Sequence, residues 1–207
     1  TTLSCAGYAM FSQLKVGFDT VLIDEAAQAV EASTLIPLKY GCRRLILIGD
    51  PEQLPATVFS QVATQHNYEQ SLFHRLQQGG QRVTMLTTQY RMHPYISKFP
   101  AHRFYQGALH DAPGLEVSRA CEWHKFHAFA PYVVYNVEDG KATEAHSSWI
   151  NETEALLALH IVRHLTTHYA DRITPQSIGI VTPYNGQVRH IRKLLKEELG
   201  EPGGNFE

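Results

Sequence analysis

The stretch VLIDEAAQAVE, residues 21–31, places two acids at the end of what reads as a buried strand. The apolar run Val-Leu-Ile stops at Asp24 and Glu25, and small residues and a glutamine follow. Continuous apolar runs of this kind are typical of parallel strands covered on both faces. An acid at such a strand exit can hold Mg²⁺ through water, and its neighbour can orient or deprotonate an attacking water. The stretch therefore predicts a phosphate-handling site in an α/β protein.

A second stretch, LILIGDPEQLP at residues 45–55, ends in the same way at Asp50, and Gln53 follows. Ligands bind outside the carboxyl ends of parallel strands, so we expect Asp24, Glu25, Asp50 and Gln53 to converge on one crevice. Gln53 carries both a donor and an acceptor, which lets it touch a terminal phosphate and a water together. The alternative is that Asp24 and Asp50 only cap the helices that follow. Two such strand ends favour the site.

The rest of the chain alternates between apolar runs and helical patterns, which predicts an α/β doubly wound sheet. Two helices are expected after the later runs, one with Asn151 as N-cap and Glu154 as its capping-box partner, and one that ends at Gly200. Residues 107–130 show no clear period, and we interpret them as a loop or insertion. The predicted strands are DTVLID, RLILIGD, VTMLTT, YVVYNV and SIGIVTP (residues 19–24, 44–50, 83–88, 132–137 and 177–183).

Composition narrows the classes of protein that the chain can belong to. It has 207 residues, 43% of them hydrophobic and 18% charged, as in ordinary globular proteins. The net charge of −2 gives no global basic field, so a nucleic-acid partner would need a local patch. Three scattered cysteines suit a reducing compartment, and no apolar run approaches the roughly 20 residues of a spanning helix. The first residue is Thr1 instead of Met, which suggests a fragment.

Four motifs in order resemble those of superfamily 1 helicases, in the branch that contains senataxin and the nonsense-mediated-decay helicase. VLIDEAAQA is similar to their Walker B element and LILIGDPEQLP to the motif after it. TTQYRMHPYISKFPAHRFY and IGIVTPYNGQ resemble two later motifs, and TTLS resembles the motif before Walker B. The resemblance covers nearly the whole chain and is weakest over residues 107–130. It implies tandem RecA-like domains of the P-loop NTPase type with parallel sheets, over residues 1–87 and 88–207, both incomplete.

The resemblance also implies a role for individual residues. Asp24 would organise Mg²⁺ through water, Glu25 would polarise the lytic water, and Gln53 would sense the γ-phosphate of ATP, with Asp50 beside it. Arg91 would reach the same phosphate with a permanently charged planar fork, and Tyr90 would stack on the adenine. Without the family, Tyr90 and Arg91 read as a structural aromatic and a surface ion pair. The expected nucleic-acid contacts are Thr1, Thr2, Ser4, Thr182, Tyr184, Asn185 and Gln187, although ordinary helix capping explains Thr182 equally well.

The expected function is an ATP-dependent helicase that translocates on single-stranded RNA or DNA. Two family elements are absent from the sequence: no G-x-x-x-x-G-K-[ST] phosphate loop occurs, and no late Gln-Gly and arginine motif. We therefore expect the chain alone to be inactive. Two alternatives remain, a non-catalytic RNA-clamping scaffold and the helicase part of a DNA-repair nuclease–helicase. The resemblance favours the nucleus, with the cytoplasm as the alternative, and no membrane association.

Histidines offer a competing metal hypothesis. Cys121, His124 and His127 have ligand-like spacing, and His160, His164 and His168 follow at helical spacing. The first set lacks a clear fourth ligand for structural zinc. The second set is expected on the polar face of a long helix, where solvated histidines are common. Zinc at either set is the weaker hypothesis.

Overall fold

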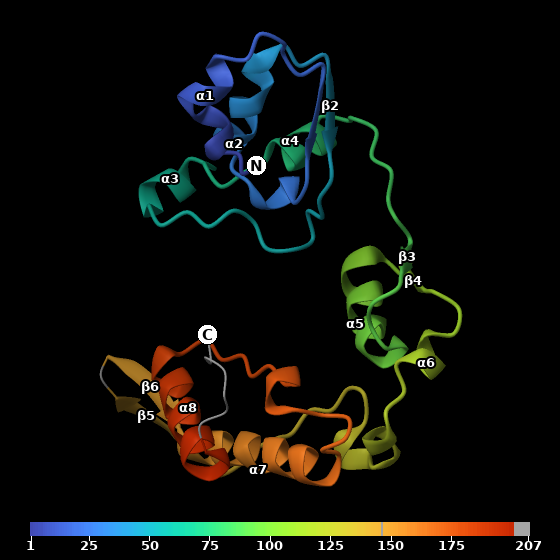
Figure 1. Cartoon of the computed structure of the whole chain (residues 1–207), viewed down its shortest axis with the longest axis vertical. Coiled ribbons are helices and arrows are strands. Elements are labelled where there is room, and N and C mark those ends of the chain that lie inside the picture. Colours follow the sequence, from blue (N-terminus) through green and yellow to red (C-terminus); the bar gives the residue numbers. More distant parts are fainter. Residues whose placement is uncertain (146, 201–207) are drawn as a thin grey trace. The chain divides into compact units, whose positions relative to one another are not determined.

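The computed structural model describes residues 1–145 and 147–200. These residues form two compact units, which divide after Tyr132. Figure 1 shows the elements of each unit. The first unit is built around a parallel pair of strands, β1 (Thr20–Ile23) and β2 (Arg44–Leu47), with Ile23 opposite Leu47. This pair confirms the first two predicted strands. Both strands are shorter than predicted and stop before the acids.

One face of this pair carries the core of the first unit. Val21 and Ile23 are buried together with Ala26, whereas Leu22 is 57% exposed. The expectation of strands covered on both faces is therefore wrong for this pair, because the described helices cover only one side of it. The core residues packed against it are Leu3, Leu38, Cys42, Leu45, Leu47 and Phe73.

Short helices complete the first unit. An ion pair between Arg75 and Glu31, with Nε–Oε2 and Nη2–Oε1 distances of 2.7 Å, joins α4 to α2. The Arg75 guanidinium lowers the pKa of the Glu31 carboxyl. The α-helices of this unit are α1 (Ala9–Ser12), α2 (Glu31–Leu35), α3 (Gln61–Gln65), α4 (Leu72–Gln78), α5 (Pro94–Tyr105) and α6 (Leu115–Ser118). The 3-10 helices are Cys5–Gly7, Ala26–Gln28, Ile36–Tyr40, Glu122–Lys125 and His127–Phe129.

A second small parallel pair holds the segment after α4. Strand β3 (Thr88–Gln89) lies beside β4 (His110–Asp111), with Gln89 opposite Asp111. Residues 107–130, expected to be loop, thus contribute a strand and three short helices. His93 caps α5 by accepting a hydrogen bond at Nδ1 from the Tyr95 amide (3.1 Å).

The second unit packs two long helices against each other. Asn151 is the N-cap of helix α7 (Glu152–His168), as predicted, because its side chain accepts a hydrogen bond from the Glu154 amide at 3.2 Å. The Asn151 amide donates to Gln187 Oε1 (2.8 Å) and not to the Glu154 side chain that was expected to complete a capping box. Helix α8 (Asn185–Leu199) ends at Gly200, whose φ of 76° suits glycine. Their shared core consists of Ala155, Leu159, Val162, Ile191 and Leu195. In the sequence, a 3-10 helix (Pro175–Ser177) separates α7 from α8.

A β-hairpin that the sequence reading missed precedes α7. Strands β5 (Ala142–Ala145) and β6 (Ser148–Asn151) pair antiparallel, with Thr143 opposite Ile150. Ser148 Oγ accepts a hydrogen bond from the Gly186 amide (2.9 Å), which anchors the hairpin to the start of α8.

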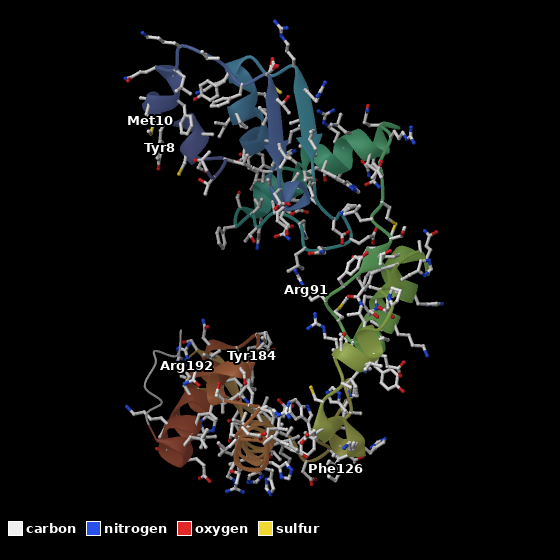
Figure 2. All side chains as sticks on the ribbon, turned by 45° about the vertical axis from the view of Figure 1, so that its right-hand side comes forward. Tyr8, Met10, Arg91, Phe126, Tyr184 and Arg192 are labelled. Carbon is white, nitrogen blue, oxygen red and sulfur yellow. The ribbon has the colours of Figure 1, made fainter. Side chains whose placement is uncertain are left out.

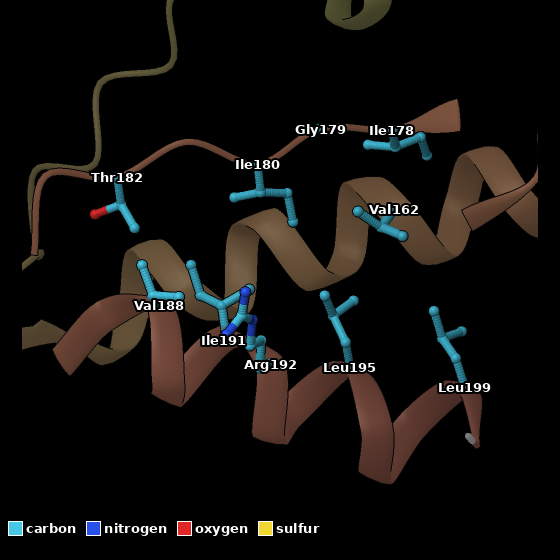
Figure 3. Close-up of a pocket in the computed structure, with 10 residues that line it drawn as sticks. All are labelled: Val162, Ile178, Gly179, Ile180, Thr182, Val188, Ile191, Arg192, Leu195 and Leu199. Carbon is cyan, nitrogen blue, oxygen red and sulfur yellow. The ribbon is translucent and has the colours of Figure 1, made fainter. Parts of the chain in front are cut away.

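Three of the five predicted strands do not form. Residues 83–87, 132–137 and 177–183 contain no strand, although Thr88 joins β3. Val181 is 97% exposed, Leu86 82% and Val134 76%. A strand needs a hydrogen-bonded neighbour, and within the described residues these segments have none. An apolar cavity of about 230 Å³ lies between residues 178–182 and α8, with Val162 of α7 also in its wall (Figure 3).

Gly49 provides a test of the close approach at the ends of β1 and β2. A Cβ built on Gly49 would lie 2.7 Å from the Ala27 nitrogen and 3.1 Å from the Ala26 nitrogen, which are backbone atoms. We expect Gly49→Ala to lower the free energy of unfolding by about 1–3 kcal/mol, the usual range for overpacking. The measurement is thermal unfolding of the full-length protein. Gly179→Ala is the control, because no heavy atom lies within 4 Å of its added Cβ. Equal stability of the two variants would contradict the close approach.

Candidate functional site

The acidic ends of β1 and β2 lie side by side, as the sequence predicted for parallel neighbours. Ile48 donates its amide to Ile23 O (2.9 Å), and the Ala26 amide donates to Ile48 O (2.8 Å). These bonds continue the strand pairing past the ends of the strands and bring Gly49 against the amide of Ala27. Asp24 and Asp50 therefore lie at the same edge of the sheet, just beyond the carboxyl ends of the two strands.

Glu25 adopts a backbone conformation that glycine, and less often asparagine, takes readily. Its φ is 52° and its ψ is 35°, in the left-handed region. This conformation costs an ordinary L residue about 1–2 kcal/mol. Strained residues cluster at functional sites. The sequence carried no signal for this strain, since a glycine or asparagine would have been the usual choice.

The first acidic pair is exposed and held by local hydrogen bonds. Asp24 Oδ1 accepts from the Glu25 amide (3.1 Å), and Glu25 Oε2 accepts from Gln28 Nε2 (3.2 Å). Gln28, which positions the Glu25 carboxylate, was not predicted as part of the site. Both carboxylates offer hard oxygen ligands at a solvent-accessible edge, the donor chemistry that Mg²⁺ prefers. Among the described residues, no three His, Cys, Asp or Glu side chains group closely enough to hold a metal on their own.

The Asp50 carboxylate holds the turn that follows β2 through hydrogen bonds to Glu52 and Gln53. Its Oδ1 accepts from the Glu52 amide (3.0 Å), and its Oδ2 accepts from Gln53 Nε2 (3.0 Å) and from the Tyr105 hydroxyl (2.5 Å). Asp50 thus fixes the side-chain amide of Gln53 and leaves its Oε1 atom as an acceptor for a water. Tyr105, the last residue of α5, was not predicted as part of this site.

Arg91 and Tyr90 lie in the loop between β3 and α5. Both are exposed, Tyr90 at 69%. Figure 2 labels Arg91, whose side chain projects from the ribbon ahead of α5. The Arg91 and Met92 amides donate to Gln89 Oε1 (2.8 and 2.7 Å), so the loop has a defined path. The contacts of Arg91 with a phosphate and of Tyr90 with adenine stay predictions.

Gln187 occupies a different place from the surface contact that the sequence suggested. It is 6% exposed, and its amide makes two hydrogen bonds to the backbone of Asn151: Oε1 accepts from Asn151 N (2.8 Å) and Nε2 donates to Asn151 O (2.9 Å). Gln187 therefore locks the end of β6 onto α8. Burial, which a single sequence does not reveal, distinguishes this role from a contact with a partner.

The remaining predicted nucleic-acid contacts lie at the surface of two different units. In the second unit, Tyr184 is 49% exposed at the start of α8 and is labelled in Figure 2. Thr182 is half-buried and lines the apolar cavity. In the first unit, Thr1, Thr2 and Ser4 are exposed, and Thr2 Oγ1 accepts a hydrogen bond from the Cys5 amide at 3.2 Å.

The ligand-like spacing of Cys121 and His124 has a structural explanation. His124 Nδ1 accepts a hydrogen bond from the Cys121 amide (3.1 Å), and the two residues form a capping box for the 3-10 helix Glu122–Lys125. Burial, and then the neighbouring His93, lower the pKa of His124. On α7, the rings of His164 and His168 stack with centroids 4.1 Å apart.

Comparisons with known proteins match the chain to AAA domains and to parts of proteins named as helicases. Two family models, each described as an AAA domain, match residues 1–61 and 68–203. The chain is 44% identical to the probable helicase MAGATAMA 3 of Arabidopsis thaliana over 96% of its length and 25% of that protein. It is 40% identical to helicase SEN1 of Saccharomyces cerevisiae (97% of the chain, 9% of that protein). It is 36% identical to the ATP-dependent helicase upf1 of Schizosaccharomyces pombe (93% and 21%).

The chain spans a quarter or less of the length of these relatives. No helix among the described residues combines the length and the apolarity needed to cross a membrane.

A pH titration tests the contact between Tyr105 and Asp50. Burial, and then the hydrogen bond to the Asp50 carboxylate, raise the pKa of Tyr105 to about 12. The neutral phenol is favoured in the folded state, so its stabilising contribution is full below the ordinary tyrosine pKa of about 10 and is lost as the pH rises towards 12. Tyrosinate absorbance of the full-length protein should show one late-titrating phenol that disappears in Tyr105→Phe. In Asp50→Asn its midpoint should move towards 10. A late phenol that persists in Tyr105→Phe would refute the assignment.

A substitution at Gln187 tests its structural role. Gln187→Leu removes the acceptor of the half-buried Asn151 N–H, and the loss of such a partner costs about 1–3 kcal/mol. We expect lower stability and faster hydrogen exchange at the Asn151 amide, measured by mass spectrometry or NMR. Gln176→Leu, at an exposed position, is the matched control. Unchanged exchange at Asn151 in Gln187→Leu would rule out the lock.

Proposed function

The chain belongs to the AAA domain family, in the superfamily 1 helicase branch that includes senataxin, and on this basis we propose that it is part of an ATP-dependent helicase motor. Family membership gives it the α/β, RecA-like fold class of P-loop NTPases. Hydrolysis of ATP between two RecA-like domains would drive translocation on single-stranded RNA or DNA. The observation that carries the proposal is the pair of acidic strand ends, Asp24-Glu25 and Asp50…Gln53, held at one edge by the pairing of β1 with β2.

The carboxylates at this edge fit a magnesium nucleotide. We assign Asp24 to Mg²⁺ through water, because its exposed carboxylate is a hard oxygen ligand. Mg²⁺ would neutralise charge on the phosphates. Glu25 would orient or deprotonate the attacking water, and Gln53, held by Asp50, would accept a hydrogen bond from that water through Oε1. The phosphates themselves need a cradle of the P-loop type, which these 207 residues do not contain.

The loop before α5 would supply the remaining groups of the nucleotide site. Arg91 is assigned to the γ-phosphate, because its fork matches phosphate oxygens, and Tyr90, 69% exposed, is assigned to the adenine. The proposed Mg²⁺ and water ligands lie before residue 87, and the proposed phosphate and adenine contacts, Arg91 and Tyr90, lie after it. This order supports a domain boundary near residue 87. Residues 81–87 carry no regular secondary structure between α4 and β3. The compact units divide later, after Tyr132, and the matches to the two family models divide earlier, between residues 61 and 68.

Nucleic acid would be held by hydroxyl and amide donors in place of a basic surface, consistent with the net charge of −2. The proposed contacts are Thr1, Thr2 and Ser4 in the first unit, and Thr182, Tyr184 and Asn185 in the second. Gln187, buried and bonded to Asn151, would act by fixing the start of α8. We also propose a nuclear location, on the strength of the resemblance to senataxin.

Glu25→Gln tests the assignment of the catalytic acid. The amide keeps the size of the side chain but cannot act as a base, so the full-length protein should bind ATP with Mg²⁺ and hydrolyse it about 10²–10⁴-fold more slowly. Steady-state phosphate release with saturating single-stranded RNA measures the rate, and nucleotide titration measures binding. Glu116→Gln, at an exposed position of α6, controls for loss of charge. Near-normal turnover in Glu25→Gln would remove Glu25 from this role and favour the non-catalytic clamp.

A further inference from the structure

One side chain, Gln89, holds the whole loop that carries Arg91. Its Oε1 accepts hydrogen bonds from the amides of Arg91 (2.8 Å) and Met92 (2.7 Å), and its Nε2 donates to Met92 O (2.9 Å). Backbone groups normally find such partners within helices or sheets. Here one amide provides three of them. The orientation of the Gln89 amide therefore decides the path of the backbone at Arg91.

Asp111 fixes that orientation. Gln89 Nε2 donates a second hydrogen bond to Asp111 Oδ1, at 2.5 Å. A carboxylate only accepts hydrogen bonds, so a flipped amide would set Gln89 Oε1 against an Asp111 oxygen and leave both without a proton between them. Hydrogen bonds to a charged acceptor are also the stronger kind. Asp111 thus selects the one amide orientation that presents Oε1 to the Arg91 and Met92 amides.

Asp111 is itself held in place from two sides. Ser97 Oγ, from a residue of α5 that is 2% exposed, lies 2.6 Å from the same carboxylate oxygen. In the backbone, Asp111 is the partner of Gln89 in the β3–β4 pair. His110 donates its amide to Thr87 O (2.7 Å), and Ala112 donates to Gln89 O (2.9 Å). The strand pair therefore fixes the Asp111 backbone beside Gln89, and the bond from Ser97 holds the carboxylate on the side of Gln89.

The segment after Asp111 contacts the same loop further along. Arg119 Nη2 donates to Tyr90 O at 3.2 Å. The ring of His124 meets the ring of His93 edge-on, with centroids 5.8 Å apart, and His93 is 8% exposed. Arg119 and His124, from the segment that follows Asp111, thus contact the loop at two further points.

We propose that Asp111 is a positioning residue for Arg91: through Gln89 it sets the backbone from which the Arg91 side chain reaches the nucleotide phosphate. The inference rests on the proposed function of Arg91. The Arg91 side chain is long and exposed, so only its backbone origin limits the direction of its reach. Misplacement of a phosphate-binding group by about 1 Å can reduce the rate about 10²-fold. Asp111 would therefore affect turnover without touching the nucleotide.

The test uses the full-length protein with Asp111→Leu, which removes the acceptor, and Asp111→Asn, which can restore it. Glu116→Ala, a nearby exposed acid, is the matched control. Hydrogen exchange at the Arg91 and Met92 amides reports on the loop. Steady-state ATPase with saturating single-stranded RNA reports on function, and Arg91→Ala and the Arg91→Ala/Asp111→Leu double variant complete a mutant cycle.

We expect Asp111→Leu to speed exchange at both amides and to lower kcat about 10–100-fold, with less than about a threefold change in the KM for ATP. Asp111→Asn should recover most of the rate. The double variant should be no slower than Arg91→Ala by more than about twofold, because Asp111 acts through Arg91. If Asp111→Leu proves unfolded, Ser97→Ala removes one of the two bonds to Asp111 and should give smaller effects of the same kind.

The two ways of failing are distinguishable. If Arg91→Ala slows hydrolysis strongly but Asp111→Leu leaves loop exchange unchanged, or adds its full effect to that of Arg91→Ala, Asp111 does not position Arg91. If Arg91→Ala hydrolyses ATP at the normal rate, the proposed role of Arg91 is wrong and the positioning proposal fails with it.

Discussion

The parallel pairing of β1 with β2 is the constraint on which the acidic site depends. The Ile48 amide bonds to Ile23 O and the Ala26 amide bonds to Ile48 O, so the pairing extends past both strands to the residues that carry function. At that point the two backbones approach so closely that only glycine fits at residue 49. Glu25 turns through a left-handed conformation in the same place. The strain at Glu25 is consistent with an acid whose position matters more than its backbone energy.

Sequence patterns identified the parts of the fold that local chemistry specifies. The Val-Leu-Ile run and the Asn151 cap were predicted correctly, because apolar periodicity and capping act within a few residues. The same patterns failed for residues 132–137 and 177–183, which have strand-like composition but no strand partner among the described residues. β-branched and aromatic residues favour a half-buried pleated surface. A segment rich in them forms a strand only where a neighbouring strand completes that surface.

Parts of the candidate site depended on long-range contacts that a single sequence does not reveal. Gln187 follows a predicted strand exit and reads as a surface donor, but its amide pairs with Asn151, which is 36 residues away. Asp111 lies in a segment without periodicity, and its importance appears only when its carboxylate meets Gln89 and Ser97. Cys121 and His124 show the opposite case, since a spacing that suggested metal ligands serves as a helix cap.

The most direct test of the central claim is a structure of the full-length protein with Mg²⁺ and a non-hydrolysable ATP analogue. The quantities to measure are the distances from the Asp24 and Glu25 carboxylates and the Arg91 guanidinium to the bound metal and γ-phosphate. We predict that Asp24 contacts a Mg²⁺-bound water, that Glu25 faces the water in line with the γ-phosphate, and that Arg91 bonds to that phosphate. A nucleotide bound away from the ends of β1 and β2, or an Arg91 that contacts only nucleic acid, would contradict this prediction.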